Sequence, residues 1–232
     1  GATQVHIGAG PRTDDGVIAV MYPIISHFDI RRDYTRHVDG LPRRDGIRAF
    51  LKSRGLSLAE GNPDAPAASD TIAGLASRKN AAFRRLLDRD GISLYQDALV
   101  LLRGVEARGC RTGLITSSRN CAAILAAAGL TGRFDVEVDG VVTARLQLAG
   151  KPAPDTFLEA VRRLGVAPSQ TALVEDSIAG IEAASAGGFA LVIAVDRAGI
   201  AAELRAVGAD LVVDDLACLV EGAEETSPEL GP

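Results

Sequence analysis

Two adjacent carboxylates, Glu175 and Asp176, follow a short apolar stretch of the chain at residues 171–174. Neighbouring negative charges repel each other, so they are costly unless a cation or hydrogen bonds offset the repulsion. Mg²⁺ prefers a few carboxylates together with water and a phosphate oxygen. We therefore predict that Asp176 and Glu175 bind a magnesium ion. The alternative is that Asp176 caps the following helix and that Glu175 is solvated.

A second group of polar residues, 116–120 (TSSRN), lies between the apolar residues 113–115 and a helical pattern. Hydroxyls and free backbone N–H groups at the start of a helix can bind an anion. We expect an anion site here, although the same residues could form an N-cap cluster and nothing more.

Lys151 is the third candidate, because it lies next to Pro152 and close to Pro154. Proline restricts the backbone, so the ammonium group could be held facing a fixed anion. The alternative is an exposed loop lysine before a helix that proline opens.

The elements that must position these groups alternate between strand and helix from residue 94 onward. Strand patterns occur at 112–116, 134–138, 171–174, 190–195 and 211–213, and helical patterns at 98–107, 119–128, 154–164, 178–186 and 201–206. This alternation predicts an α/β fold with a doubly wound parallel sheet. The three polar motifs would then meet at the carboxyl ends of the strands, where such sheets bind ligands.

Residues 28–93 differ, because they contain helical patterns at 45–54 and 71–88 and no alternation with strands. We predict a small helical cap inserted into a core made of residues 1–27 and 94–221. The acidic residues 222–232 are expected to form a flexible tail.

The order of an anion cradle, a fixed lysine and a carboxylate pair resembles the second, third and fourth motifs of the haloacid dehalogenase superfamily of phosphotransferases. Residues 150–155 (GKPAPD) and 175–180 (EDSIAG) look like its β-phosphoglucomutase-like branch. In that branch a helical cap follows the first motif, and residues 38–43 (VDGLPR) and 78–80 (RKN) are similar to cap motifs. The resemblance spans residues 28–219.

By this resemblance, Thr116 and Lys151 hold the transferring phosphoryl group, and Asp176 with Glu175 binds Mg²⁺. The remaining substrate contacts come from the core loop and from the cap. Ser117, Ser118 and Asn120 bind phosphate or the far end of the sugar phosphate, Arg43 binds a second phosphate, and Lys79 contacts the substrate. The milder alternatives are that Arg43 is solvated and that Lys79 lies on an exposed helix face.

The first motif of the superfamily, Asp-x-Asp-Gly-Val, is not well matched. Asp15 falls at the general acid/base position, but Thr13 stands where the attacking aspartate is expected. Asp14 would point to the opposite face of a strand. Asp29 is a weaker candidate, because Arg31 then takes the place of the second aspartate. Either the motif is degenerate or these residues are not the family's N-terminal sequence.

The composition is that of a globular protein, with 47% hydrophobic and 24% charged residues and no tryptophan. A net charge of −5 and few aromatic residues argue against nucleic acid and anionic membranes as partners. No apolar run or N-terminal layout predicts a membrane span or signal peptide. Isolated Cys110, Cys121 and Cys218 argue against a disulfide framework or a zinc site and favour the cytoplasm.

The resemblance implies a Mg²⁺-dependent phosphotransferase acting on a small sugar phosphate, as a monomer or weak homo-oligomer. It would be a β-phosphoglucomutase, converting β-glucose 1-phosphate to glucose 6-phosphate, or a sugar-phosphate phosphatase. The alternative is a member that binds phosphate and Mg²⁺ but does not turn over. A dinucleotide-dependent oxidoreductase is disfavoured, since no G-x-G-x-x-G follows a first strand.

Overall fold

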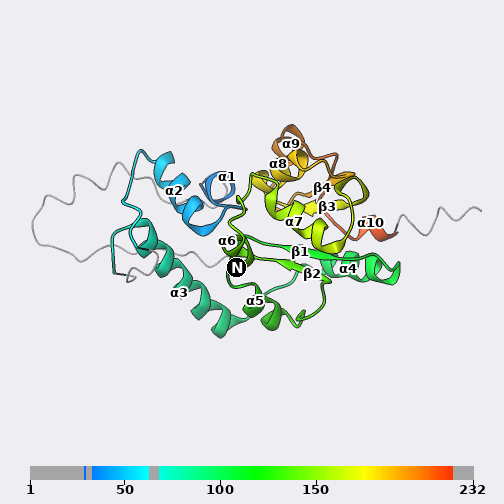
Figure 1. Ribbon diagram of the computed structural model, residues 1–232, viewed down its shortest axis with the longest axis horizontal. Coiled ribbons are helices and arrows are strands. Elements are labelled where there is room, and N and C mark those ends of the chain that lie inside the picture. The colour runs from blue at the N-terminus through cyan, green and yellow to red at the C-terminus, as the bar shows by residue number, and fades with distance from the viewer. Residues whose placement is uncertain (1–28, 30–32, 63–67, 222–232) are drawn as a thin grey trace, which may run out of the picture.

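The computed structural model describes residues 29, 33–62 and 68–221, and within them all strand pairs are parallel (Figure 1). The strands are β1 (Gly113–Ile115), β2 (Val136–Val138), β3 (Ala172–Glu175), β4 (Leu191–Val195) and β5 (Leu211–Val213). Strand β1 pairs with β2, while β3, β4 and β5 pair in that order. The α/β prediction is confirmed. One continuous sheet was expected, but no strand among the described residues joins β1 to β3.

The hydrophobic core lies between the sheet and helices whose small side chains, such as alanine, allow close packing on the strands. Helix α8 (Ile178–Ala186) packs against β3 and β4, and its Ile181 and Ala184 are fully buried. In β4 only Leu191 is exposed, and the other strand residues are buried, as expected for an apolar strand covered on both faces.

Further helices cover the strands. Helix α7 (Asp155–Leu164) packs on β1 and β2, and α9 (Ala201–Ala206) packs on β5. The other helices of this half are α4 (Gln96–Ala107), α5 (Cys121–Ala128), α6 (Gly140–Arg145), the 3₁₀ helix η4 (Pro168–Gln170) and α10 (Cys218–Glu221). None of the described helices combines the length and the hydrophobicity needed to cross a membrane.

Helix α6 was not predicted. It is short, and its start depends on the Asp139 side chain, which accepts hydrogen bonds from the N–H groups of Val141 and Val142 at 3.0 and 2.8 Å. Such a cap satisfies backbone donors that a six-residue helix cannot satisfy itself. Helix α1 (Thr35–His37), of three residues, was missed because so short a helix has no detectable periodicity.

The described residues between 33 and 93 contain helices and no strand, as the sequence predicted. We call residues 33–62 and 68–93 the helical segment. Helices α2 (Arg43–Ser53) and α3 (Ile72–Asp90) pack against each other, and together with α1 they lie to one side of the strands (Figure 1). A buried ion pair of 2.5 Å between Arg54 and Asp33 ties the end of α2 to the start of the segment.

Candidate active site

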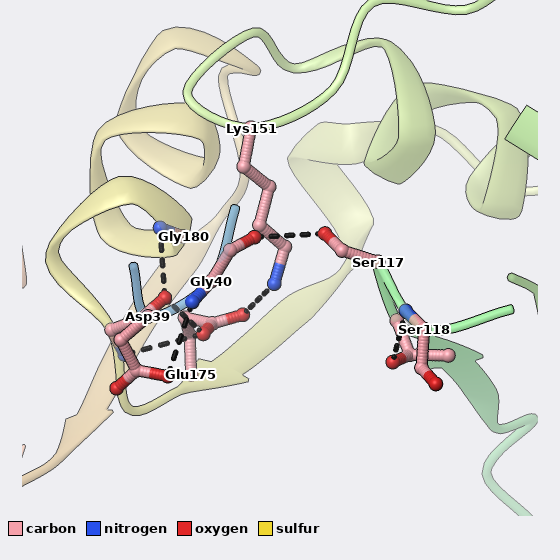
Figure 2. A network of polar contacts seen from close by, with 9 residues as sticks. Asp39, Gly40, Ser117, Ser118, Lys151, Glu175 and Gly180 are labelled. Atoms are coloured by element: carbon pink, nitrogen blue, oxygen red, sulfur yellow. Dashed lines mark hydrogen bonds and ion pairs between the residues drawn. The ribbon is translucent and has the colours of Figure 1, made fainter. Parts of the chain in front are cut away.

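The centre of the site is an ion pair between Lys151 and Glu175 (Figure 2). Lys151 Nζ lies 2.5 Å from Glu175 Oε2, and the two side chains are only 6% and 10% exposed. The ammonium also lies 5.0 Å from the ring centre of Phe157. A buried charge needs a partner because it has lost its water. The third and fourth motifs therefore form one unit, in which Lys151 is held directly by Glu175.

Ser177 holds the other oxygen of Glu175. Its N–H and hydroxyl lie 3.2 and 2.7 Å from Glu175 Oε1, and its Oγ accepts from Gly180 N at 3.1 Å. Ser177, not Asp176, is thus the N-cap of α8. Burial alone would raise the pKa of Glu175, but Lys151 and Ser177 outweigh burial, so the pKa lies below its ordinary value. Glu175 is accordingly a fixed anion with both oxygens engaged.

Asp176 is in a different electrostatic position. Burial, followed by repulsion from Glu175 and Asp39, raises the pKa of its carboxyl to about 7, although Lys151 opposes this effect. Its side chain nevertheless remains exposed to solvent. A cation at this carboxylate would remove the repulsion.

These residues fit Mg²⁺ through Asp176, with Glu175 beside it as an oriented second carboxylate. Mg²⁺ commonly takes one or two carboxylates and keeps several waters. Among the described residues, no group of three or more Asp, Glu, His or Cys side chains is arranged to hold a metal ion alone. A site completed by water and a phosphate oxygen is consistent with this donor set.

The predicted anion loop turns from β1 into α5. Thr116 Oγ1 accepts from Ser118 N, and Ser118 Oγ accepts from Asn120 N, each at 3.1 Å. These hydrogen bonds resemble those of an N-cap cluster, which was the alternative interpretation of residues 116–120. A hydroxyl that accepts one hydrogen bond still has its own O–H to donate, so Thr116 and Ser118 can also serve an anion.

Two other residues of this loop contact the helical segment. Ser117 Oγ donates to the carbonyl of Gly40 at 2.8 Å across 77 positions of sequence (Figure 2), and Asn120 Nδ2 donates to Asn80 Oδ1 at 2.9 Å. Ser117 and Asn120, predicted to bind substrate, thus also join the core to the helical segment.

Residues 40–42 pack on the other motifs as well. A Cβ atom at Gly40 would lie 2.3 Å from Ser177 Oγ, and one at Gly150 would lie 2.5 Å from Pro42 Cγ. The helical segment therefore covers the loop that carries Lys151 and the start of α8.

A cationic cluster lies where the helical segment meets the loop before α5. It consists of Arg43 and Lys79 of the helical segment and Arg119 of the loop. Burial, and then the nearby Arg119, lowers the pKa of Arg43, while burial and Arg43 lower the pKa of Lys79. The Lys79 ammonium lies 5.6 Å from the ring centre of Tyr34. Like charges gathered in this way favour an anion between them.

Several of these participants were not assigned a site role from sequence. They are Tyr34, Asp39, Gly40, Asn80, Arg119 and Ser177. Most of them lie inside motifs that the sequence had already identified, so their position in a motif could have marked them as site residues. Which groups they contact could not be predicted from the sequence.

The predicted first motif, with Thr13, Asp14 and Asp15, lies outside the described residues. Asp29 is described, and its carbonyl accepts from the N–H groups of Asp33 and Tyr34 at 2.7 and 3.3 Å. It therefore leads into the helical turn that precedes α1.

Gly40→Ala tests the packing of the helical segment on the core. We expect the free energy of unfolding to fall by about 2–5 kcal/mol, because a positive φ costs about 1–2 and overpacking about 1–3 kcal/mol. Gly55→Ala is the matched control, since Gly55 has φ +67° against +73° at Gly40 but nothing within 4 Å of its Cβ position. Urea unfolding measures both. Equal losses would show that the contact with Ser177 contributes nothing.

Comparison with known proteins shows which family the chain resembles. A family model described as haloacid dehalogenase-like hydrolase matches residues 18–188. A β-phosphoglucomutase of Mycobacterium bovis is 43% identical over 196 residues, which are 83% of this chain and 75% of the relative. A fructose-1-phosphate phosphatase of Escherichia coli is 41% identical over 114 residues, or 49% of this chain and 58% of the relative.

Among solved structures, a β-phosphoglucomutase from Clostridium difficile superimposes with a TM-score of 0.63 and 25% identity. The match covers 81% of this chain and 78% of that one.

Proposed function

Because this chain belongs to the haloacid dehalogenase-like hydrolases, a family of enzymes, we propose that it is a Mg²⁺-dependent phosphotransferase acting on a sugar phosphate. The observation that carries the proposal is the presence of two separate cationic positions in one site. Lys151 lies on the core, and the Arg43, Lys79 and Arg119 cluster lies beside the helical segment. Two such positions suit a substrate or intermediate with phosphate at both ends.

At the core, Lys151 binds the transferring phosphoryl group and stabilises the negative charge that develops on its oxygens. Glu175 keeps the ammonium in place through the 2.5 Å ion pair. The Thr116 hydroxyl and the backbone N–H groups of the loop before α5 bind other oxygens of the same group.

Asp176, supported by Glu175, holds Mg²⁺, which when bound neutralises charge on the phosphoryl group. The proposed residues also explain why the two neighbouring carboxylates are tolerated. Glu175 is neutralised by Lys151, and Asp176 is left for the cation.

On the opposite side, Arg43 binds the phosphate that does not react, because the guanidinium can donate two parallel hydrogen bonds to it. Lys79 adds a second positive charge. Ser117, Ser118 and Asn120 line the loop toward the far end of the sugar phosphate.

We propose that residues 28–93 form the cap, that residues 1–27 and 94–221 form the core, and that residues 222–232 are a tail. The hydrogen bonds Ser117–Gly40 and Asn120–Asn80 would then belong to a closed arrangement of cap and core. The same proposal assigns general acid/base catalysis to Asp15. It includes a cytoplasmic location and a monomer or weak homo-oligomer.

The mutase and the phosphatase differ in the group that discharges the phosphorylated enzyme. A second sugar phosphate does so in a mutase, and water does so in a phosphatase. The curated relatives include one of each kind. The cationic cluster at the cap favours the mutase, because it can hold the second phosphate of a sugar bisphosphate.

The test has two steps. Hydrolysis of an aryl phosphate with and without Mg²⁺ measures phosphoryl transfer. Analysis of the products formed from β-glucose 1-phosphate then distinguishes a mutase, which forms glucose 6-phosphate, from a phosphatase, which releases phosphate. We expect Mg²⁺-dependent turnover of the aryl phosphate and formation of glucose 6-phosphate. Release of phosphate alone would assign a phosphatase.

A second candidate function follows from Thr13 at the position of the attacking aspartate. A chain without that carboxylate would bind phosphate and Mg²⁺ without turnover. Binding of both ligands with no hydrolysis of the aryl phosphate would establish this function and exclude the enzyme.

A further inference from the structure

Asp39 is a carboxylate at the site that none of the proposed catalytic steps uses. It lies in the turn at residues 38–40 of the helical segment, and Figure 2 shows it beside Gly40 and close to Glu175. Its Oδ1 accepts from Gly40 N at 3.1 Å. No other described residue donates a hydrogen bond to this carboxylate. It therefore has acceptor capacity that the described part of the chain does not use.

Asp39 interacts electrostatically with a lysine from each of the two cationic positions. Burial raises its pKa most, the Gly40 N–H lowers it, and Glu175 raises it further. Lys151 and Lys79 both lower it. The carboxylate thus interacts with the lysine of the core and with the lysine of the cationic cluster.

A carboxylate in this position cannot contact a phosphate favourably, because both groups are negative. It suits the uncharged part of a substrate that bears hydroxyl groups. Hydroxyls that donate to a carboxylate form charge-assisted hydrogen bonds, which are stronger than neutral ones. A site with such an acceptor also rejects analogues that lack the hydroxyls, because the acceptor is then left unpaired.

We propose that Asp39 is a specificity-determining residue that accepts hydrogen bonds from sugar hydroxyl groups, between the phosphates bound at Lys151 and at Arg43 and Lys79. This inference rests on the proposed function. It adds that recognition of the sugar, as distinct from its phosphates, comes from a carboxylate of the helical segment.

The experiment compares two bisphosphates of similar span in the presence of Mg²⁺. Glucose 1,6-bisphosphate carries hydroxyls, and hexane-1,6-diol bisphosphate carries none. Isothermal titration calorimetry gives Kd for each with the wild-type chain and with Asp39→Asn, whose amide oxygen can still accept from Gly40 N. We expect Asp39→Asn to weaken binding of the sugar bisphosphate by about tenfold or more and to leave the diol bisphosphate within about twofold.

Two variants serve as controls. Asp90→Asn replaces an exposed carboxylate at the end of α3, paired with Arg89, and should change neither affinity. Lys79→Met should weaken both bisphosphates. Circular dichroism checks that each variant is folded, and Asp39→Ser replaces Asp39→Asn if the latter is not.

Equal weakening of both bisphosphates by Asp39→Asn would overturn the inference, because the carboxylate would then act on phosphate or metal. No change for either would overturn it as well. In both cases the proposed function stands, since the wild-type chain binds. If the wild-type chain binds neither bisphosphate, the proposed function fails and the inference fails with it.

Discussion

Lys151→Met is expected to reduce kcat for an aryl phosphate by about a hundredfold to a thousandfold, the loss typical of a group that stabilises transition-state charge. The reduction should appear in kcat more than in KM, because the ammonium interacts most strongly as charge builds up on the transferring oxygens. Lys52→Met is the control, because Lys52 is an exposed lysine of α2 in the groove that Lys151 also lines. It should retain normal kinetics.

The same substitution should destabilise the fold, because Glu175 is left as a buried charge without its partner. Breaking a buried ion pair in this way costs about 3–5 kcal/mol. Adding Glu175→Gln to Lys151→Met should restore most of that stability but none of the activity. Urea unfolding and steady-state kinetics on both variants separate the two roles. Recovery of activity in the double variant would contradict a direct role for Lys151.

Asp176→Asn is expected to abolish Mg²⁺-dependent turnover, with a loss of about a thousandfold or more, since a metal ion contributes several kcal/mol of charge stabilisation. Titration of the variant with Mg²⁺ should show no saturable effect on thermal stability, whereas the wild-type chain should be stabilised. Asp214→Asn is the matched control. Asp214 is an exposed carboxylate directly after β5, and its removal should change neither property.

A pH series without Mg²⁺ tests the electrostatics of Asp176 independently of activity. The folded-state pKa of about 7 lies above the ordinary value, so the ionised carboxylate is disfavoured by folding. The wild-type chain should therefore lose stability relative to Asp176→Asn as the pH rises from 4 through 7. Since the side chain is exposed and solvent screens the repulsion, we expect a difference of about 1 kcal/mol. A constant difference across this range would contradict the raised pKa.

The sequence alone determined most strands and helices of residues 94–221, although not α6, and the order of the polar motifs. The predictions at 178–186, 201–206 and 211–213 coincide with α8, α9 and β5. The periodicity of apolar residues and the glycines that end helices are local signals. They therefore predict helices and strands without knowledge of which segments pack together. Local motifs likewise identified Lys151 and Asp176 as candidates.

Only the tertiary structure decided which groups face one another. Lys151 and Glu175 are 24 positions apart, Asn120 and Asn80 are 40 apart, and Ser117 and Gly40 are 77 apart. No local pattern specifies such pairs, because they depend on how the helical segment packs over the strand ends. Packing also made Glu175 the partner of Lys151 and left Asp176 as a carboxyl group with a raised pKa, although the two are adjacent in the sequence. The physical reason is that burial and charge at a site are properties of surrounding segments, which a single stretch of sequence does not contain.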